Sequence, residues 1–393
     1  MVGMDGNPFV PSFGRTPPVL AGRDQLVAQF AQTFSNGTWV PERASLIRGL
    51  RGIGKTVLLN AVEDAARTAG WFVISETARL DLLHSLTHAV LPRLLREHDP
   101  DGSTRHLIGA GISGASLSAQ VTEDHLPEQD LRDQLTQLCR LAADRGVGVL
   151  ITIDELHGDV LDQIRPLTIA LQHVQREEFD IAFVAAGLPG GIDEVLQDKG
   201  TTFLRRATLI ELDSLTLDEA TQALHEPIAT AGRSIEPDAL EEAALASRGY
   251  PFLVQAIGSF AWNEAPSEDR ITLRAVRSAA RRAHRTMGSS IHAPSLSRLS
   301  PTDRTFLAAM AHDEGASRLG DVANRMGVDT KYASVYRQRL MTAGLIEAPA
   351  WGRVAFALPY LRDYLREHVV ASTLQRSAKS TFPEAEPDLR GGD

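Results

Sequence analysis

The chain has 393 residues, enough for two or three domains of ordinary size, and its composition is that of a soluble globular protein. Its single cysteine, Cys139, excludes an internal disulfide framework and a cysteine-based zinc cluster, and we expect this side chain to be buried. No apolar run reaches the ~18 residues that a membrane helix needs, and residues 1–14 lack the charged-then-apolar order of a secretion signal, so we expect a cytoplasmic protein.

The net charge of −10 conceals an asymmetry along the chain. Residues 1–270 carry 22 Lys and Arg against 38 Asp and Glu, whereas residues 271–368 carry 15 against 8. A basic C-terminal third on an acidic body is what contact with a nucleic acid requires. A contact between the two parts of the chain, or between subunits, requires the same asymmetry, so the charge alone leaves these alternatives open.

The N-terminal segment, residues 1–19, contains four prolines and several glycines, so we predict an extended arm. An amphipathic helix is predicted from about residue 20 to Phe34, and Asn36-Gly37 ends it.

A glycine-rich pattern follows this helix. The pattern G-x-x-x-x-G-K-[ST] is matched at every fixed position by Gly49-Leu50-Arg51-Gly52-Ile53-Gly54-Lys55-Thr56. An apolar run precedes it and a helix-like run begins at Val57, so the turn and the helix N-terminus direct backbone N–H groups at one point where a polyphosphate can bind. In this P-loop, we predict that Lys55 neutralises the β- and γ-phosphates and that the Thr56 hydroxyl coordinates Mg²⁺.

Strands alternating with helices through the next part of the chain predict a parallel α/β sheet. Beyond the strand before the P-loop, strands are predicted at 71–75, 147–153, 181–186 and 207–212. Helices are predicted at 57–69, 80–97, 131–143 and 159–178, and residues 187–191 are interpreted as a turn. Residues 98–128 are rich in glycine, and we interpret them as an inserted loop or small hairpin, with a disordered connector as the alternative.

The third predicted strand is nearly all apolar and ends in Asp154-Glu155. Carboxylates at the carboxyl end of a central strand lie where open α/β sheets bind ligands. We therefore predict that Asp154 holds Mg²⁺ and that Glu155 orients or deprotonates the attacking water, which is the Walker B arrangement.

Two arginines, Arg205 and Arg206, directly precede the fifth predicted strand. An arginine presented to a neighbouring subunit at this place can stabilise charge on the γ-phosphate during its transfer. The alternative is a surface pair that balances an acidic domain.

From Thr216 onward we predict helices and no further strands until the C-terminal region. The four predicted helices are 217–229, 236–248, 251–265 and 271–287. The last of them contains five arginines and no acid, and it carries most of the basic surplus.

The C-terminal region predicts three short helices, 301–312, 319–326 and 331–343, and then a hairpin of 344–347 with 354–358. This order is typical of a winged helix-turn-helix. Its recognition helix would offer Lys331, Arg337 and Arg339 to phosphates or base edges, and Arg353 would serve the wing. Residues after about 372 are predicted to be disordered.

The P-loop, the Walker B residues and two further segments together resemble a known family. The segments that carry the resemblance are Gly22-Arg23, 48–56, 153–157 and 249–253. They are similar to the AAA+ branch of P-loop ATPases, specifically to bacterial proteins whose nucleotide-binding module resembles that of the origin-recognition-complex (ORC) ATPases. The resemblance covers residues from about 15 to 370.

This resemblance implies an α/β fold, a P-loop NTPase with a five-stranded parallel sheet of order 5-1-4-3-2. It implies a helical lid that closes over ATP or ADP with Mg²⁺, and often a C-terminal winged helix. It also implies nucleotide contacts at Gly22, Arg23, Val57 and Pro251. The predicted domains are an arm (1–19), an ATPase core (20–215, with 98–128 inserted), a lid (216–290), a winged helix (291–370) and a tail (371–393).

Two departures limit what the family implies. The fourth strand ends in Ala185-Ala186-Gly187, which offers no polar side chain to sense the γ-phosphate, so slow hydrolysis is expected. The lid has Gly249-Tyr250-Pro251 where many members place a sensor arginine, which resembles the signal-transduction ATPases with numerous domains (STAND). Arg248 is either a substitute or a solvated residue at a helix end.

We therefore expect a slowly hydrolysing ATPase that acts as a nucleotide-dependent switch and couples to double-stranded DNA, or to DNA-bound partners, through the winged helix. An arginine finger would make it a homo-oligomer. The alternative is a STAND-like regulator whose winged helix mediates autoinhibition or protein assembly without binding DNA. The small basic excess of residues 300–368 leaves both hypotheses open. A metabolic kinase would leave the lid and the winged helix unexplained.

Overall fold

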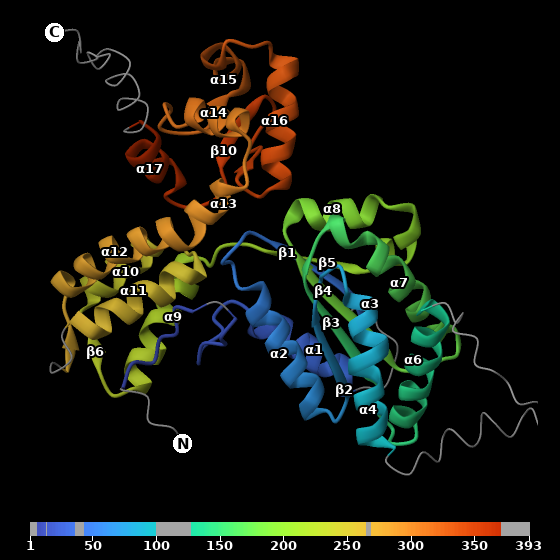
Figure 1. Cartoon of the computed structure of the whole chain (residues 1–393). Coiled ribbons are helices and arrows are strands. Elements are labelled where there is room, and N and C mark those ends of the chain that lie inside the picture. The colour runs from blue at the N-terminus through green and yellow to red at the C-terminus, as the bar shows by residue number, and fades with distance from the viewer. Residues whose placement is uncertain (1–5, 13, 36–42, 100–126, 265–268, 371–393) are drawn as a thin grey trace, which may run out of the picture. The chain divides into compact units, whose positions relative to one another are not determined.

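The computed structural model describes residues 6–12, 14–35, 43–99, 127–264 and 269–370 (Figure 1). The predicted insertion lies almost wholly outside these residues, and the predicted tail lies entirely outside them. The chain divides into two compact units, one up to Ala283 and one from His284. This division falls inside a helix, and the domain boundary proposed after residue 290 stays a prediction.

A five-stranded parallel sheet forms the centre of the first unit (Figure 1). Its strands are β1 (Ala44–Gly49), β2 (Phe72–Thr77), β3 (Val149–Leu156), β4 (Ile181–Gly187) and β5 (Thr208–Leu212). Their order, β2-β3-β4-β1-β5, is the predicted order counted from the other edge. Every residue of β4 is buried, whereas β5 alternates between half-buried and exposed residues until the buried Leu212 at its end, as expected of an edge strand.

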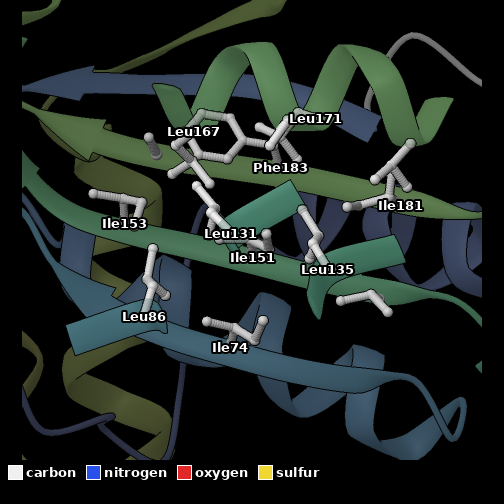
Figure 2. Close-up of a cluster of buried hydrophobic side chains, with 14 of the residues drawn as sticks. Ile74, Leu86, Leu131, Leu135, Ile151, Ile153, Leu167, Leu171, Ile181 and Phe183 are labelled. Atoms are coloured by element: carbon white, nitrogen blue, oxygen red, sulfur yellow. The ribbon is translucent and has the colours of Figure 1, made fainter. Parts of the chain in front are cut away.

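Helices cover both faces of this sheet. On one side lie α1 (Asp24–Ser35) and α2 (Lys55–Thr68). On the other side lie a helical segment made of α3 (Leu82–Ser85), η2 (Leu86–Val90) and α4 (Leu91–His98), and the two helices α6 (Pro127–Ala143) and α7 (Leu161–Arg176). The 3₁₀ turn η3 (Gly158–Val160) directly precedes α7. Figure 2 shows Leu131 of α6 and Leu167 of α7 packed against Ile151 and Phe183 of the sheet. The apolar residues of the central strands thus build the core that fixes the position of the strand ends.

In the described residues of the first unit, one α-helix was not predicted. Residues after β4, interpreted as a turn, form α8 (Pro189–Gln197), which the 3₁₀ segment η4 (Lys199–Arg206) follows. Gly190 and Gly191 weaken the helical pattern in the sequence, yet Gly191 has a packing role: a Cβ there would lie 2.9 Å from the Leu156 carbonyl oxygen.

The predicted lid consists of four helices, as expected: α9 (Leu217–Thr230), α10 (Pro237–Ser247), α11 (Pro251–Glu264) and α12 (Leu273–Met287). The expectation that no strands follow Thr216 in this region was wrong. Two-residue strands β6 (Ser234–Ile235) and β7 (Arg270–Ile271) pair in parallel between these helices. Such short strands carry no alternating pattern that a sequence could reveal.

The second unit contains the end of α12 and a compact group of short elements. They are η5 (Gly288–His292), α13 (Ala293–Ser297), α14 (Pro301–Met310), β8 (Ser317–Arg318), α15 (Leu319–Met326), α16 (Thr330–Thr342), β9 (Ile346–Glu347), β10 (Arg353–Phe356), α17 (Leu361–Leu365) and η6 (Arg366–Val370). Three helices followed by a hairpin, with β8 as a third strand in the order β8-β10-β9, fit the predicted winged helix-turn-helix. Among the described residues, no helix is both long and apolar enough to cross a membrane.

Candidate nucleotide-binding site

The turn between β1 and α2 has the backbone form that an anion-binding loop needs. Gly52 and Gly54 adopt left-handed φ angles of 81° and 99°. Gly54 caps α2 without a side-chain hydrogen bond, so the N–H groups of the first helical turn have no capping acceptor. Backbone donors at a helix N-terminus, where the helix dipole is positive, favour a phosphate.

Lys55, the first residue of α2, is held over this turn. Its Nζ donates hydrogen bonds of 2.9 Å to the carbonyl oxygens of Gly49 and Leu50. Burial lowers the pKa of Lys55 to about 8, although the Asp154 carboxylate acts in the opposite direction. A bound polyphosphate would supply the negative charge that this partly desolvated ammonium group lacks.

Thr56 and Asp154 are brought together from two elements that lie 98 residues apart in the chain. The Thr56 hydroxyl donates a 2.6 Å hydrogen bond to Asp154 Oδ2, and the backbone N–H of Glu155 donates a 2.8 Å hydrogen bond to Asp154 Oδ1. A hydroxyl and a carboxylate at one point are the oxygen donors that Mg²⁺ prefers, with phosphates and waters completing its shell. Among the described residues, no cluster of three or more His, Cys, Asp or Glu is placed to hold a metal. The Thr56 hydroxyl and the Asp154 carboxylate fit Mg²⁺ held jointly with a phosphate.

Glu155 follows in an irregular part of β3. The register of β3 against β4 shifts between Ile153 and Leu156, and Glu155 adopts a left-handed φ of 55° with an exposed side chain. A non-glycine residue in this conformation costs about 1–3 kcal/mol, and such strained residues cluster at active sites. The strand thus continues past the predicted end, and the bulge exposes the side chain predicted to handle water.

Of the other predicted nucleotide contacts, Val57 lies in the first turn of α2. Gly22, Arg23 and Pro251 lie where the lid joins the sheet. Arg23 donates a 2.6 Å hydrogen bond to the Asp213 carbonyl, and burial lowers the pKa of its guanidinium. Gly249 has a φ of 68°, and a Cβ there would lie 1.9 Å from the Leu215 carbonyl oxygen, so only glycine fits. Pro251 is the first residue of α11, next to this junction.

Comparison with protein families gives two matches. Residues 19–184 match the family described as AAA ATPase domain, and residues 289–365 match a domain of unknown function (DUF8462). The fold as a whole is that of an ORC-like AAA+ P-loop ATPase.

Solved structures with this fold extend over nearly the whole chain. The Aeropyrum pernix ORC2 protein in ADPNP-ADP complexes is 16% identical with a TM-score of 0.59, and the match covers 93% of this chain and 98% of that one. The ADP form of the same protein is 16% identical with a TM-score of 0.52, and the match covers 93% of this chain and 97% of that one. The A. pernix ORC1 protein in complex with DNA is 17% identical with a TM-score of 0.43, and the match covers 93% of this chain and 97% of that one. Comparison with curated protein sequences finds no significant match.

In the ATPase domain, the two candidate finger arginines differ. Arg205 donates to the carbonyl oxygens of Leu196, Gln197 and Asp198, so it caps the C-terminus of α8. Arg206 is exposed and makes no hydrogen bond or ion pair with any described residue. Of the pair, Arg206 is the one whose guanidinium remains available.

The four residues proposed to contact nucleic acid also differ in their availability. Lys331 is exposed on α16. Arg339, whose side chain is 55% exposed, forms a 3.0 Å ion pair with Asp303, whose side chain is only 2% exposed, so its charge is shared with a partner inside the unit. Arg353 donates to the Ala316 carbonyl, and Arg337 is half-buried with an Nε that finds no partner among the described residues.

Sequence reasoning missed a cavity of about 250 Å³ next to Thr56 and Asp154. It runs between α2 and the ends of β2 and β3, and its lining includes Asn60, Glu63 and Thr152. The Thr152 hydroxyl donates a 2.6 Å hydrogen bond to the buried Glu63 carboxylate. In the sequence, Glu63 and Asn60 have the spacing of an ordinary polar helix face. The cavity could therefore not be predicted before the position of the sheet beside this helix was known.

Proposed function

We propose that the P-loop binds ATP with Mg²⁺ and that the chain hydrolyses this ATP slowly, acting as a nucleotide-dependent switch. The observation that carries the proposal is the hydrogen bond between Thr56 and Asp154, because it places a P-loop hydroxyl and a Walker B carboxylate at one point. The same fold in A. pernix ORC2, described in ADPNP-ADP complexes, supports a nucleotide as the ligand.

In this proposal each residue has a distinct role. The N–H groups at the start of α2 and the Lys55 ammonium bind the phosphates, and Thr56 and Asp154 hold Mg²⁺, which neutralises phosphate charge. Glu155 accepts a proton from the attacking water while the water oxygen bonds to the γ-phosphorus. The bond between the γ-phosphorus and the oxygen that bridges it to the β-phosphate breaks, and ADP leaves with that oxygen. The end of β4 has only Ala185, Ala186 and Gly187, so no side chain there stabilises the γ-phosphate and turnover is slow.

We further propose that the second unit acts as a winged helix that couples the nucleotide state to double-stranded DNA or to DNA-bound partners. The exposed cation Lys331 on α16 supports this role. A specific observation favours the second candidate, a STAND-like regulator without DNA: the ion pair of Arg339 with Asp303 partly neutralises one of the four cations proposed to contact DNA.

One experiment separates the two candidates. The solution mass of the chain is measured with ADP and then with a non-hydrolysable ATP analogue, each with and without duplex DNA. The switch hypothesis expects a DNA complex whose amount depends on the nucleotide. Assembly that depends on the nucleotide without any DNA complex would favour the regulator. No change with either nucleotide would contradict both.

A further inference from the structure

The N-terminal arm is anchored to lid helix α11. Phe9 is 5% exposed, and its ring lies 2.5 Å from the place where a Cβ on Gly258 would stand. Asn7 donates hydrogen bonds to the Ser259 carbonyl (3.2 Å) and hydroxyl (3.1 Å). The Val10 N–H donates a 3.0 Å bond to the Gln255 side chain. The absence of a side chain at position 258 thus makes room for the arm.

A few residues later the same arm lies against α2, the helix that the P-loop opens. Asn60 donates hydrogen bonds from its side-chain amide to the Gly14 carbonyl (3.0 Å) and to the Thr16 hydroxyl (3.4 Å). A Cβ on Gly14 would lie 3.9 Å from the methyl group of Thr56. The arm therefore spans from the lid to the residue predicted to hold Mg²⁺.

Arg15 stands between the two residues that Asn60 holds. It is exposed, and it forms no hydrogen bond or ion pair with the residues that the structure describes. Consecutive Cα atoms are about 3.8 Å apart, so the backbone of Arg15 is near Thr56 and a flexible arginine side chain can reach the phosphate end of the P-loop. Exposed to solvent and without a partner among the described residues, this guanidinium is free to pair with an anion that arrives at the P-loop.

The position also matches a deficit in the site. The strand end that should sense the γ-phosphate has only apolar residues, Ala185 and Ala186, and glycine. Guanidinium groups bind phosphate oxygens through two parallel N–H donors. An arginine brought by the arm would supply, from within the chain, the phosphate-binding side chain that the end of β4 lacks.

We propose that Arg15 contacts the terminal phosphate of bound ATP and makes the site distinguish ATP from ADP. This inference rests on the proposed function, because it requires a nucleotide at the P-loop. Since the arm is also anchored to α11, the contact links the presence of the γ-phosphate to the lid. Asn60 acts as a positioning residue, because it fixes the backbone on both sides of Arg15.

The test compares affinities of the full chain for ADP and for a non-hydrolysable ATP analogue, both with Mg²⁺, by calorimetry. A hydrogen bond to a charged group contributes about 1.5–3 kcal/mol, so Arg15→Ala should weaken binding of the ATP analogue about 10- to 100-fold and leave ADP within about twofold. Arg15→Lys should recover part of the loss. Asn60→Ala should shift the ATP-to-ADP preference in the same direction although Arg15 is still present.

The matched control is Arg176→Ala, since Arg176 is an exposed arginine at the C-terminal end of α7, outside the site. It should leave both affinities unchanged. An equal loss of ADP and ATP affinity in Arg15→Ala, or no loss of either, would overturn the assignment of Arg15 while leaving nucleotide binding itself intact. Wild-type protein that binds neither nucleotide would instead overturn the proposed function.

Discussion

The hydroxyl of Thr56 and the carboxylate of Asp154 lie 2.6 Å apart in a direct hydrogen bond, although one opens α2 and the other lies near the end of β3. This contact depends on the parallel sheet, because β1 and β3 end at the same edge and only β4 lies between them. Because of this contact, a substitution at either residue affects the position proposed for Mg²⁺. The P-loop is therefore the first place to test.

Lys55→Ala should reduce ATP affinity by at least about 100-fold while leaving the fold intact, because it removes the cation held over the P-loop and disturbs no apolar core. Calorimetric titration with ATP and a thermal melt of the variant measure the two effects. Unchanged affinity would show that the phosphates bind elsewhere.

The same lysine makes ATP affinity depend on pH. Burial lowers its pKa to about 8, so the free protein loses the proton as the pH rises through 8, whereas a bound phosphate anion favours the protonated form. Affinity should therefore be nearly constant below pH 7 and fall by up to about tenfold for each pH unit above 8. In Lys55→Arg, whose charge persists, a weaker affinity that no longer varies between pH 7 and 9 is the matched expectation.

Glu155→Gln should bind ATP as the wild type does and hydrolyse it about 100-fold or more slowly, since the amide keeps the shape and cannot accept the proton. Single-turnover measurements separate this step from product release. Equal rates in the two proteins would mean that another group activates water, and the residues around the cavity beside Thr56 would be the next to substitute.

Much of the ATPase domain could be predicted because its signals are local. The glycine spacing from Gly49 to Thr56 and the apolar run before Asp154 each lie within a few consecutive residues, and parallel topology then places them together. Helix α8 was missed because its glycines weaken the helical pattern, and the close approach of Gly191 to Leu156 of β3 leaves no local pattern in the sequence.

The contacts between distant segments were beyond sequence reasoning. An extended arm was predicted, but nothing near Phe9 indicates that it packs on Gly258, 249 positions later. The Arg339–Asp303 ion pair was missed for the same reason. From the sequence alone, a cation on a predicted recognition helix is expected to be available for DNA, and only the structure locates the buried carboxylate that faces it.

Substitution of the two arginines before β5 should have different effects, one on stability and the other on turnover. Arg205→Ala removes the donor to three carbonyl groups at the end of α8 and should lower stability by about 1 kcal/mol, measured by denaturant unfolding. Arg206→Ala should leave stability unchanged and lower the turnover reached at high protein concentration, if it acts on a neighbouring subunit. Turnover per chain that is independent of concentration in the wild type would argue against such a finger.

Gly258→Ala should release the arm from the lid, because the added methyl group would overlap the Phe9 ring. Loss of the buried ring corresponds to about 2–3 kcal/mol of arm docking. Limited proteolysis within residues 6–16 reports this opening. The variant Phe9→Leu, which keeps an apolar anchor of smaller width, should remain more resistant than Gly258→Ala.

DNA binding is the prediction that tests the role of the second unit. If cations of α16 meet phosphates, DNA affinity should fall steeply with salt, and each lost phosphate contact should reduce the log–log slope by about 0.9. Because Lys331 is exposed, Lys331→Ala should reduce the slope by that amount at unchanged stability.

Replacing both Arg337 and Arg339 by Ala would reduce the slope by up to about two units if both meet phosphates. Arg339→Ala alone should mainly destabilise the unit, by about 1–2 kcal/mol, since it leaves the buried Asp303 without its cation. Retention measurements on duplex DNA at several salt concentrations, with ADP and with an ATP analogue, provide the slopes. Wild-type protein without salt-sensitive retention in either nucleotide state would favour a regulator that assembles with protein instead.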